Sequence, residues 1–345
     1  METPCVRVER ERGEETRRRL ADADLLAEEF EIEVAEGYLY LPVADPDAVP
    51  EDLPVVAREV GARDTQDTPD ELLGFEPSYE RLGDAVILDE DDPERAREIA
   101  DAVMASDLPV RTVLNRDSKV KGELRVRDWE VLVDEGTEAS EASRGPEDAS
   151  SGTETVHREY GNEFLVDVAE VYFSPRLATE RHRVAKQVSE GERVFDMFAG
   201  VGPFVVPMAE RVGPEGRVVG VDLNERAVEY LRENARLNGV DKRVTAIQGD
   251  VRDVAPDYAD WADRVVMNLP HSADEFLDAA VTLAGDDCVL HYYDIQHEDD
   301  PFGPGEAAIR AAAEPEYEVT VENRHVVRSY APHEVNVCLD VRLTR

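Results

Sequence analysis

Two glycines, Gly200 and Gly202, stand between two apolar runs in the segment VFDMFAGVGPFVV, residues 194–206. A glycine-rich turn between a strand and a helix lets the backbone approach a nucleotide-like ligand closely. A dinucleotide site favours the pattern G-x-G-x-x-G, but Val205 stands where the third glycine is expected. Asp196 in the same turn would repel a pyrophosphate. The turn therefore predicts a nucleotide-like ligand other than a dinucleotide.

Two more aspartates end the next strand-like runs. Asp222 ends VVGVDLN, where a carboxylate can accept both hydroxyls of a ribose, and Asp250 ends AIQGDVRD, where it can accept from an adenine amino group. Each of them alone could instead cap a helix. The ordered set fits an adenosine with a cationic tail, such as S-adenosyl-L-methionine, and predicts a methyltransferase. The expected cofactor contacts here are Asp196, Gly200, Gly202, Asp222, Leu223, Asp250 and Val251.

Two other segments carry groups suited to methyl transfer. After the fourth strand-like run, Asn268 and Pro270 in MNLPHSADEFL loosely resemble the Asn/Asp-Pro-Pro-aromatic turn of class I methyltransferases, which holds a planar nitrogenous substrate. We also expect Asn268 and Pro270 to contact the cofactor. A plain Asx-Pro turn is the alternative. In SPRLATER, Ser174 starts a helix on which Arg176 and Glu180 share a face at i,i+4 spacing. An ordinary surface pair is the alternative there.

One segment reverses the charge of the chain. RDSKVKGELRVR, residues 116–127, has five basic and two acidic side chains, hence a net charge of +3 in a chain of -41. This inversion predicts a polyanionic partner, and a structural network of salt bridges is the alternative. The expected contacts with RNA are Lys119, Lys121, Arg125 and, in HREYG, Arg158.

The elements that must position these groups alternate along the second half of the chain. Strand-like runs RVFDMF, VVGVDL, VTAIQGD, RVVMNLP and VLHYYD are separated by helical patterns such as ERAVEYLRENARLNG and SADEFLDAAVTLA. This alternation predicts an α/β fold with a doubly wound, mainly parallel sheet. The last segment, residues 316–343, predicts two strands that pair antiparallel at the sheet edge.

Composition sets the class of protein. The 345 residues, 42% of them hydrophobic, allow two or three domains, and 79 acidic side chains face 38 basic ones. Such a surface suits a very salty cytoplasm, where at ~1 M salt the Debye length is only ~3 Å. Cys5, Cys288 and Cys338 are too far apart in sequence to indicate a disulfide framework or a thiolate metal site. No apolar stretch approaches the ~20 residues of a spanning helix. We expect a halophilic, cytoplasmic protein.

Five motifs in order resemble one family. VYFSPRLATER (171–181), DMFAGVGPF, MNLPHSADEFLDAA, TVHREYGN and RDSKVKGELRVRDWEVL together resemble the archaeal and eukaryotic tRNA (guanine-37-N1)-methyltransferases, from about residue 78 to the end. The resemblance implies a class I (Rossmann-like) methyltransferase domain over 171–345. A middle α/β domain is implied over 69–170, with an acidic loop at 134–154, after a small N-terminal domain over 1–68 that checks tRNA shape. We expect a monomer.

The resemblance also implies roles. N1 of guanine must lose its proton as the methyl group is attacked, and negative charge builds on O6, so a carboxylate base and a cation are required. By resemblance, Glu180 is the base, Arg181 contacts the cofactor and Tyr172 stacks near the target base. Arg125 or Arg127 is the candidate for stabilising O6, and we expect Arg127 to be a catalytic residue.

Other functions stay open at this point. A wybutosine-pathway enzyme that transfers the aminocarboxypropyl group of the same cofactor shares the sheet and some motifs. A dual-role paralogue would also methylate a tricyclic guanine derivative. A non-catalytic tRNA-binding or scaffold protein is the alternative from another class, and the intact set of Asp196, Asp222, Asp250 and Glu180 argues against it.

Overall fold

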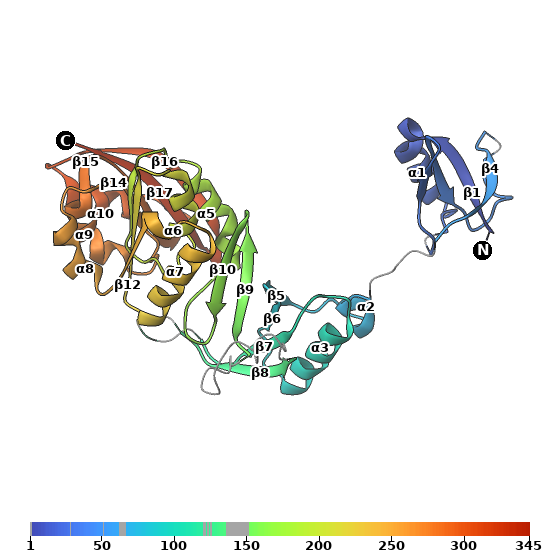
Figure 1. Cartoon of the computed structure of the whole chain (residues 1–345), viewed down its shortest axis with the longest axis horizontal. Coiled ribbons are helices and arrows are strands. Elements are labelled where there is room, and N and C mark those ends of the chain that lie inside the picture. Colours follow the sequence, from blue (N-terminus) through green and yellow to red (C-terminus); the bar gives the residue numbers. More distant parts are fainter. Residues whose placement is uncertain are drawn as a thin grey trace. The chain divides into compact units, whose positions relative to one another are not determined.

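The computed structural model describes residues 2–27, 29–50, 52–61, 67–119, 122, 124, 126–135 and 152–345. The chain divides into two compact units, one of Met1–Leu72 with Ala105–Asp107 and the other of Leu73–Met104 with Leu108–Arg345 (Figure 1). The predicted acidic loop lies almost entirely outside the described residues, as do Lys121 and Arg125.

The first unit is built on a four-stranded sheet in the order β2-β3-β1-β4. Its elements are β1 (Glu2–Glu9), α1 (Gly13–Ala21), β2 (Glu33–Ala35), β3 (Tyr38–Pro42) and β4 (Val55–Glu59). Leu20 of α1 packs on Val6, Val8 and Leu41 of the sheet, which forms a small apolar core. The sequence pattern predicts the helix and β3. It does not predict the other strands, because charged residues interrupt their apolar pattern.

A second four-stranded sheet, in the order β5-β6-β7-β8, belongs to the larger unit. It comprises β5 (Tyr79–Leu82), β6 (Ala85–Leu88), β7 (Thr112–Arg116) and β8 (Trp129–Asp134). β6 and β7 are parallel and are joined through α3 (Pro93–Ala105), after α2 (Pro69–Leu73). Asp92 caps α3 by accepting from the Glu94 N–H at 2.9 Å. The basic segment, residues 116–127, begins at the last residue of β7 and ends before β8.

A hairpin of β9 (Glu154–Glu159) and β10 (Asn162–Asp167) packs against α7 (Glu225–Leu237). Asn234 and Asn238 exchange hydrogen bonds with the backbone of Leu165 and Glu163 in β10. On its other side, the Thr155 hydroxyl donates to Asp84 Oδ1 at 2.6 Å. The hairpin thus connects the second sheet to the third within one unit.

The third sheet has seven strands in the order β13-β12-β11-β14-β15-β17-β16. β11 to β15 are parallel to one another, and β17 is antiparallel to both β15 and β16. This is the doubly wound, mainly parallel sheet with an antiparallel edge that the sequence predicts. The strand bounds are β11 (Arg193–Asp196), β12 (Arg217–Asp222), β13 (Val244–Gln248), β14 (Ala262–Met267), β15 (Ala284–His297), β16 (Glu318–Ala331) and β17 (Glu334–Thr344).

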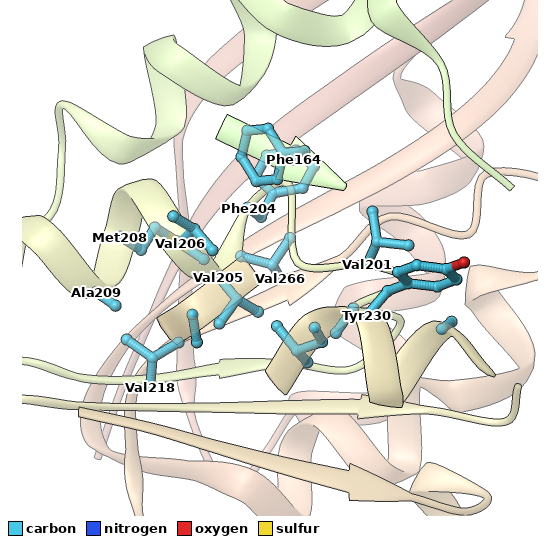
Figure 2. Close-up of a cluster of buried hydrophobic side chains, with 14 of the residues drawn as sticks. Phe164, Val201, Phe204, Val205, Val206, Met208, Ala209, Val218, Tyr230 and Val266 are labelled. Atoms are coloured by element: carbon cyan, nitrogen blue, oxygen red, sulfur yellow. The ribbon is translucent and has the colours of Figure 1, made fainter. Parts of the chain in front are cut away.

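Helices cover both faces of this sheet, so its central strands read as continuous apolar runs. One face packs against α5 (Ala178–Ala185), α6 (Val205–Arg211) and α7 (Glu225–Leu237), where Phe204, Val206 and Tyr230 join the buried cluster drawn in Figure 2. The other face packs against α8 (Val251–Val254), α9 (Leu277–Leu283) and α10 (Gly303–Ala313). The strand order reverses between β11 and β14, which is where ligands bind in open α/β sheets.

Candidate active site

The glycine turn lies directly after β11, at the reversal of strand order. Gly200 has φ +52° and Gly202 has φ +92°, a region that side chains with a Cβ rarely adopt. A Cβ on Gly202 would stand 2.4 Å from Leu231 Cδ1. Both glycines are therefore required by the backbone path, and the turn keeps its amides close to the sheet edge.

Asp222 at the end of β12 holds this turn in place. Its Oδ2 accepts from the Gly200 N–H at 2.7 Å, and its Oδ1 accepts from the Asn224 N–H at 2.9 Å. A carboxylate offers about four acceptor positions, so each oxygen can still accept from a ribose hydroxyl. Burial raises the pKa of Asp222. Leu223 beside it is 40% exposed, which leaves an apolar surface for a nucleoside.

Asp196 lies beneath the turn and is almost fully buried. Burial raises the pKa of Asp196 to about 7, and the charge of Asp222 contributes in the same direction. The Phe198 N–H donates to Asp196 Oδ1 at 3.2 Å and opposes this rise. Two neighbouring carboxylates suit a ligand with a positive charge, and they do not suit a phosphate.

Asp250 at the end of β13 caps α8. Its Oδ1 accepts from the Arg252 N–H at 2.9 Å, and the guanidinium of Arg252 also contacts both carboxylate oxygens. The hydrogen bonds from Arg252 lower the pKa of Asp250. The structure therefore shows Asp250 as the N-cap of α8, and a contact between Asp250 and adenine stays a prediction. Val251 is buried in the core beside it.

The turn after β14 places Asn268 and Pro270 next to β15. The Pro270 carbonyl accepts from the Ile295 N–H at 3.1 Å, and His271 Nε2 lies 3.0 Å from the Tyr330 hydroxyl of β16. The turn is therefore held to the antiparallel edge of the sheet. Asn268 is half-buried at the same edge as the glycine turn.

Glu180, in the first turn of α5, is 3% exposed. Its carboxylate accepts two hydrogen bonds from Arg183, at 2.7 and 2.8 Å, and one from the Tyr293 hydroxyl at 2.7 Å. His325 Nε2 of β16 lies 3.3 Å from Glu180 Oε2. The alternative of an ordinary surface pair between Arg176 and Glu180 is wrong, because Arg176 contacts Glu80 of β5 instead. The chain passes through a 3-10 turn, η2 (Pro175–Leu177), before α5, so helical spacing does not hold between the two residues.

Glu180 is one end of a buried chain of charged groups that the sequence did not reveal. Arg183 also donates to Asp340, at 2.6 and 3.1 Å. His291 Nδ1 lies 2.6 Å from Asp340 Oδ1, and Arg264 lies 2.7 Å from His291 Nε2. Because a guanidinium can only donate, Nε2 of His291 accepts and its Nδ1 carries the proton. Burial lowers the pKa of His291, which agrees with a neutral ring.

The same place brings His291, Cys338 and Asp340 within the spacing of a metal site, with possible ligand atoms within 4.8 Å of one another. Two guanidiniums already use these groups, since Arg183 contacts Asp340 and Arg264 contacts His291. Their positive charge would repel a cation. The cluster is therefore a hydrogen-bonded network.

Arg181 is also buried, at 2% exposure. Its guanidinium donates to both oxygens of Glu159, at 2.7 and 2.5 Å, and to the Ser174 carbonyl at 3.1 Å. It lies over the Phe173 ring at 5.1 Å. These contacts fasten the Tyr172–Ser174 segment to β9, and a contact between Arg181 and a cofactor stays a prediction.

Tyr172 is 41% exposed, and its carbonyl lies 4.0 Å from the ideal Cβ position of Gly200. Burial and then the charge of Arg116 lower the pKa of Arg127, while Asp89 and Tyr172 act in the opposite direction. Arg127 and Tyr172 are thus electrostatic neighbours, and their roles toward one base stay a prediction. Lys119 is exposed, and Arg158 is exposed but paired with Glu163 at 2.6 Å.

Comparisons with known proteins cover almost the whole chain. A model of the tRNA methyltransferase 5 N-terminal domain matches residues 5–51, one of the TYW2 N-terminal domain matches 65–137, and one of the TRM5/TYW2 methyltransferase domain matches 155–321. The chain is 38% identical to the tRNA (guanine(37)-N(1))-methyltransferase Trm5b of Pyrococcus abyssi, over 99% of each chain. It is 34% identical to the tRNA(Phe) (4-demethylwyosine(37)-C(7)) aminocarboxypropyltransferase of Pyrococcus horikoshii, over 81% of this chain and 94% of that one.

Among solved structures, the complex of aTrm5 and tRNALeu aligns with a TM-score of 0.71 at 32% identity, over 99% of each chain. The three family models follow one another in order along the sequence, and the curated methyltransferase relative spans nearly every residue. The chain therefore belongs to the TRM5/TYW2 methyltransferase family.

Proposed function

We propose that this enzyme transfers the methyl group of S-adenosyl-L-methionine to N1 of guanine-37 in tRNA. The observation that carries the proposal is the buried Glu180 carboxylate in a chain that matches Trm5b over 99% of its length. The aminocarboxypropyltransferase relative leaves about a fifth of this chain uncovered. The match of residues 5–51 to a tRNA methyltransferase 5 domain also favours N1 methylation.

The residues at the strand ends fit the cofactor. Asp222 is placed to accept from the ribose hydroxyls, and Leu223 offers an apolar contact to the nucleoside. Asp196 and Asp222 favour the positively charged end of the ligand. When bound, S-adenosyl-L-methionine supplies an electrophilic methyl group on a sulfonium.

The chain's own groups then act on the base. Glu180 takes the proton from N1 as the N1–methyl bond forms, so the purine does not become a cation. Arg127 stabilises the negative charge that develops on O6, and Tyr172 stacks on the ring. Asn268 and Pro270 orient its edge. The base must leave its stack to reach this site, which costs a few kcal/mol, and contacts elsewhere on the tRNA offset that energy.

The larger organisation is proposed on the same basis. Residues 1–68 and 69–170 bind tRNA, and 171–345 perform the chemistry, in a monomer. Across the described ranges, no helix is both long and apolar enough to cross a bilayer. The excess of acidic over basic residues supports the proposal that the protein works in a cytoplasm of high salt concentration.

The test uses purified full-length protein in molar KCl with S-adenosyl-L-methionine and an unmodified tRNA transcript. The matched control is the same transcript with adenosine at position 37. We expect nuclease digestion and mass spectrometry to find 1-methylguanosine only in the guanosine-37 transcript. An aminocarboxypropyl adduct, or unmodified guanosine-37, would contradict the proposal.

Replacing Asp222 by alanine is expected to raise the Kd for S-adenosyl-L-methionine roughly 10- to 100-fold. Hydrogen bonds to a charged group contribute about 1.5–3 kcal/mol each, and the variant also frees the Gly200 amide. Isothermal titration calorimetry measures the change. Asp257→Ala, at an exposed aspartate of the 3-10 turn η4 (Ala255–Tyr258), is the control and should bind normally. Unchanged affinity in Asp222→Ala would remove the ribose assignment.

A further inference from the structure

Glu180 must pass on the proton that it takes from guanine N1, and its surroundings restrict where that proton can go. This inference rests on the proposed function. The carboxylate is 3% exposed, so water has almost no access to it. Arg183 donates to both of its oxygens, and the Tyr293 hydroxyl donates to one of them. A proton that Glu180 takes from N1 must therefore pass to a group that contacts the carboxylate before Glu180 can act as a base again.

Most of the groups around Glu180 cannot exchange a proton near neutral pH. Burial raises the pKa of Tyr293 and the pKa of Cys338 well above their ordinary values. Burial lowers the pKa of Arg183, but hydrogen bonds to Glu180 and Asp340 together outweigh it and raise that pKa. The titratable groups that face this region from α5, β15, β16 and β17 are Glu180, Arg183, His291, Tyr293, His325, Cys338 and Asp340.

His325 differs from these groups in chemistry and in position. Imidazole is the side chain that ordinarily gains and loses a proton between about pH 5 and 8. Its Nε2 lies 3.3 Å from Glu180 Oε2, and its side chain is 39% exposed. It therefore touches the buried carboxylate at one end and solvent at the other. His291 offers no such path, because it is fully buried between Arg264 and Asp340.

We propose that His325 carries the proton of guanine N1 from Glu180 to solvent. As the sulfonium–methyl bond breaks and the N1–methyl bond forms, the N1–H proton moves to Glu180 Oε2. Neutral His325 accepts it on Nε2, which restores the ionised carboxylate, and the imidazolium then releases a proton to water. His325 touches neither guanine nor cofactor. It acts through Glu180, as a positioning residue that also relays the proton.

His325→Gln tests the relay, because glutamine keeps a polar side chain and removes the titration. Multiple-turnover methyl transfer to guanosine-37 tRNA is measured with saturating cofactor between about pH 5 and 8, because His325 acts only after Glu180 has taken the N1 proton. The wild-type rate should rise with pH, because a relay through imidazole requires its neutral form. The variant should be roughly 10-fold slower or more, since proton transfer by a positioned group contributes at least that much, and it should lose the rise. Added imidazole should restore the rate of His325→Gly.

His333→Gln is the matched control, because His333 is 71% exposed and pairs with Glu298 away from Glu180. It should keep the wild-type rate and pH profile. Cofactor affinity and thermal unfolding of each variant confirm that it is folded. A slow His325→Gln that keeps the wild-type pH profile, or a His325→Gly that imidazole does not rescue, overturns the relay. Formation of 1-methylguanosine by the wild type tests the proposed function separately.

Discussion

Replacing Glu180 by glutamine is expected to slow single-turnover methylation of guanine-37 by about 100-fold or more, the effect of losing a general base. Glutamine has nearly the same shape but cannot accept the N1 proton. Cofactor affinity should be unchanged, because the proposed cofactor contacts are made by other side chains, most of them at the ends of β11 to β14. Rapid-quench kinetics with labelled cofactor measure the rate, and equilibrium titration measures the affinity.

The control for this prediction is Glu210→Gln, at an exposed glutamate of α6. It should methylate at the wild-type rate. Glu180→Gln also loses its ion pair with Arg183, so thermal unfolding is recorded to show that the variant is folded under the assay conditions. A folded Glu180→Gln that methylates as fast as the wild type would remove Glu180 from the mechanism.

Patterns of adjacent residues predict the strands, turns and helix starts of this molecule that depend only on residues close together in the sequence. The apolar runs of β11 to β15 are bounded by turn residues, and the glycine turn and Asp222 follow directly from the strand ends. Asp92 before Pro93 marks the start of α3 for the same reason. The sheet was predictable because both its faces are buried and each parallel strand reads as an apolar run.

The charged network could not be found in this way, because its members are distant in sequence and hidden in apolar patterns. His291 lies within VLHYYD and Asp340 within CLDVRL, which read as buried strands. Their meeting depends on the register of β15 with β17, where His291 is opposite Asp340. No spacing rule joins either one to Arg183. A single charged residue inside a buried strand was the only available signal, because such a group requires a partner.

The pairing of Arg176 with Glu180 failed for a local reason. Helical spacing assumes about 3.6 residues per turn from the first residue onward, but Pro175 starts a 3-10 turn that rotates Arg176 toward β5. The segment SADEFLDAAVTLA shows the same effect, since it forms a short 3-10 helix, η5 (Ala273–Phe276), followed by α9. Tight turns at helix starts displace the first side chains from the predicted face.

Replacing Asp340 by alanine is expected to lower the free energy of unfolding by about 3–5 kcal/mol, the effect of breaking a buried ion pair from one side. Asp340 is 2% exposed and accepts hydrogen bonds from Arg183, His291 and Gln187. Alanine leaves the guanidinium and the imidazole N–H without this acceptor in a low-dielectric interior. Urea unfolding in molar KCl, followed by fluorescence, measures the change as a shift in midpoint.

The matched control is Asp287→Ala, because Asp287 also pairs with an arginine of the same sheet, Arg342, but is 63% exposed. An exposed pair contributes about 1 kcal/mol or less, so the two variants separate burial from charge pairing.

The pH dependence of stability gives a second measure of the role of Asp340. Burial raises the pKa of Asp340, but hydrogen bonds from His291 and Arg183 outweigh it and hold that pKa below its usual range. The unfolded state then binds more protons in acid, so the stability that Asp340 contributes is complete above about pH 4 and is lost as the pH falls. The difference between wild type and Asp340→Asn should therefore shrink in acid. A difference that stays constant down to the acid limit of folding would contradict an ionised, network-bound Asp340.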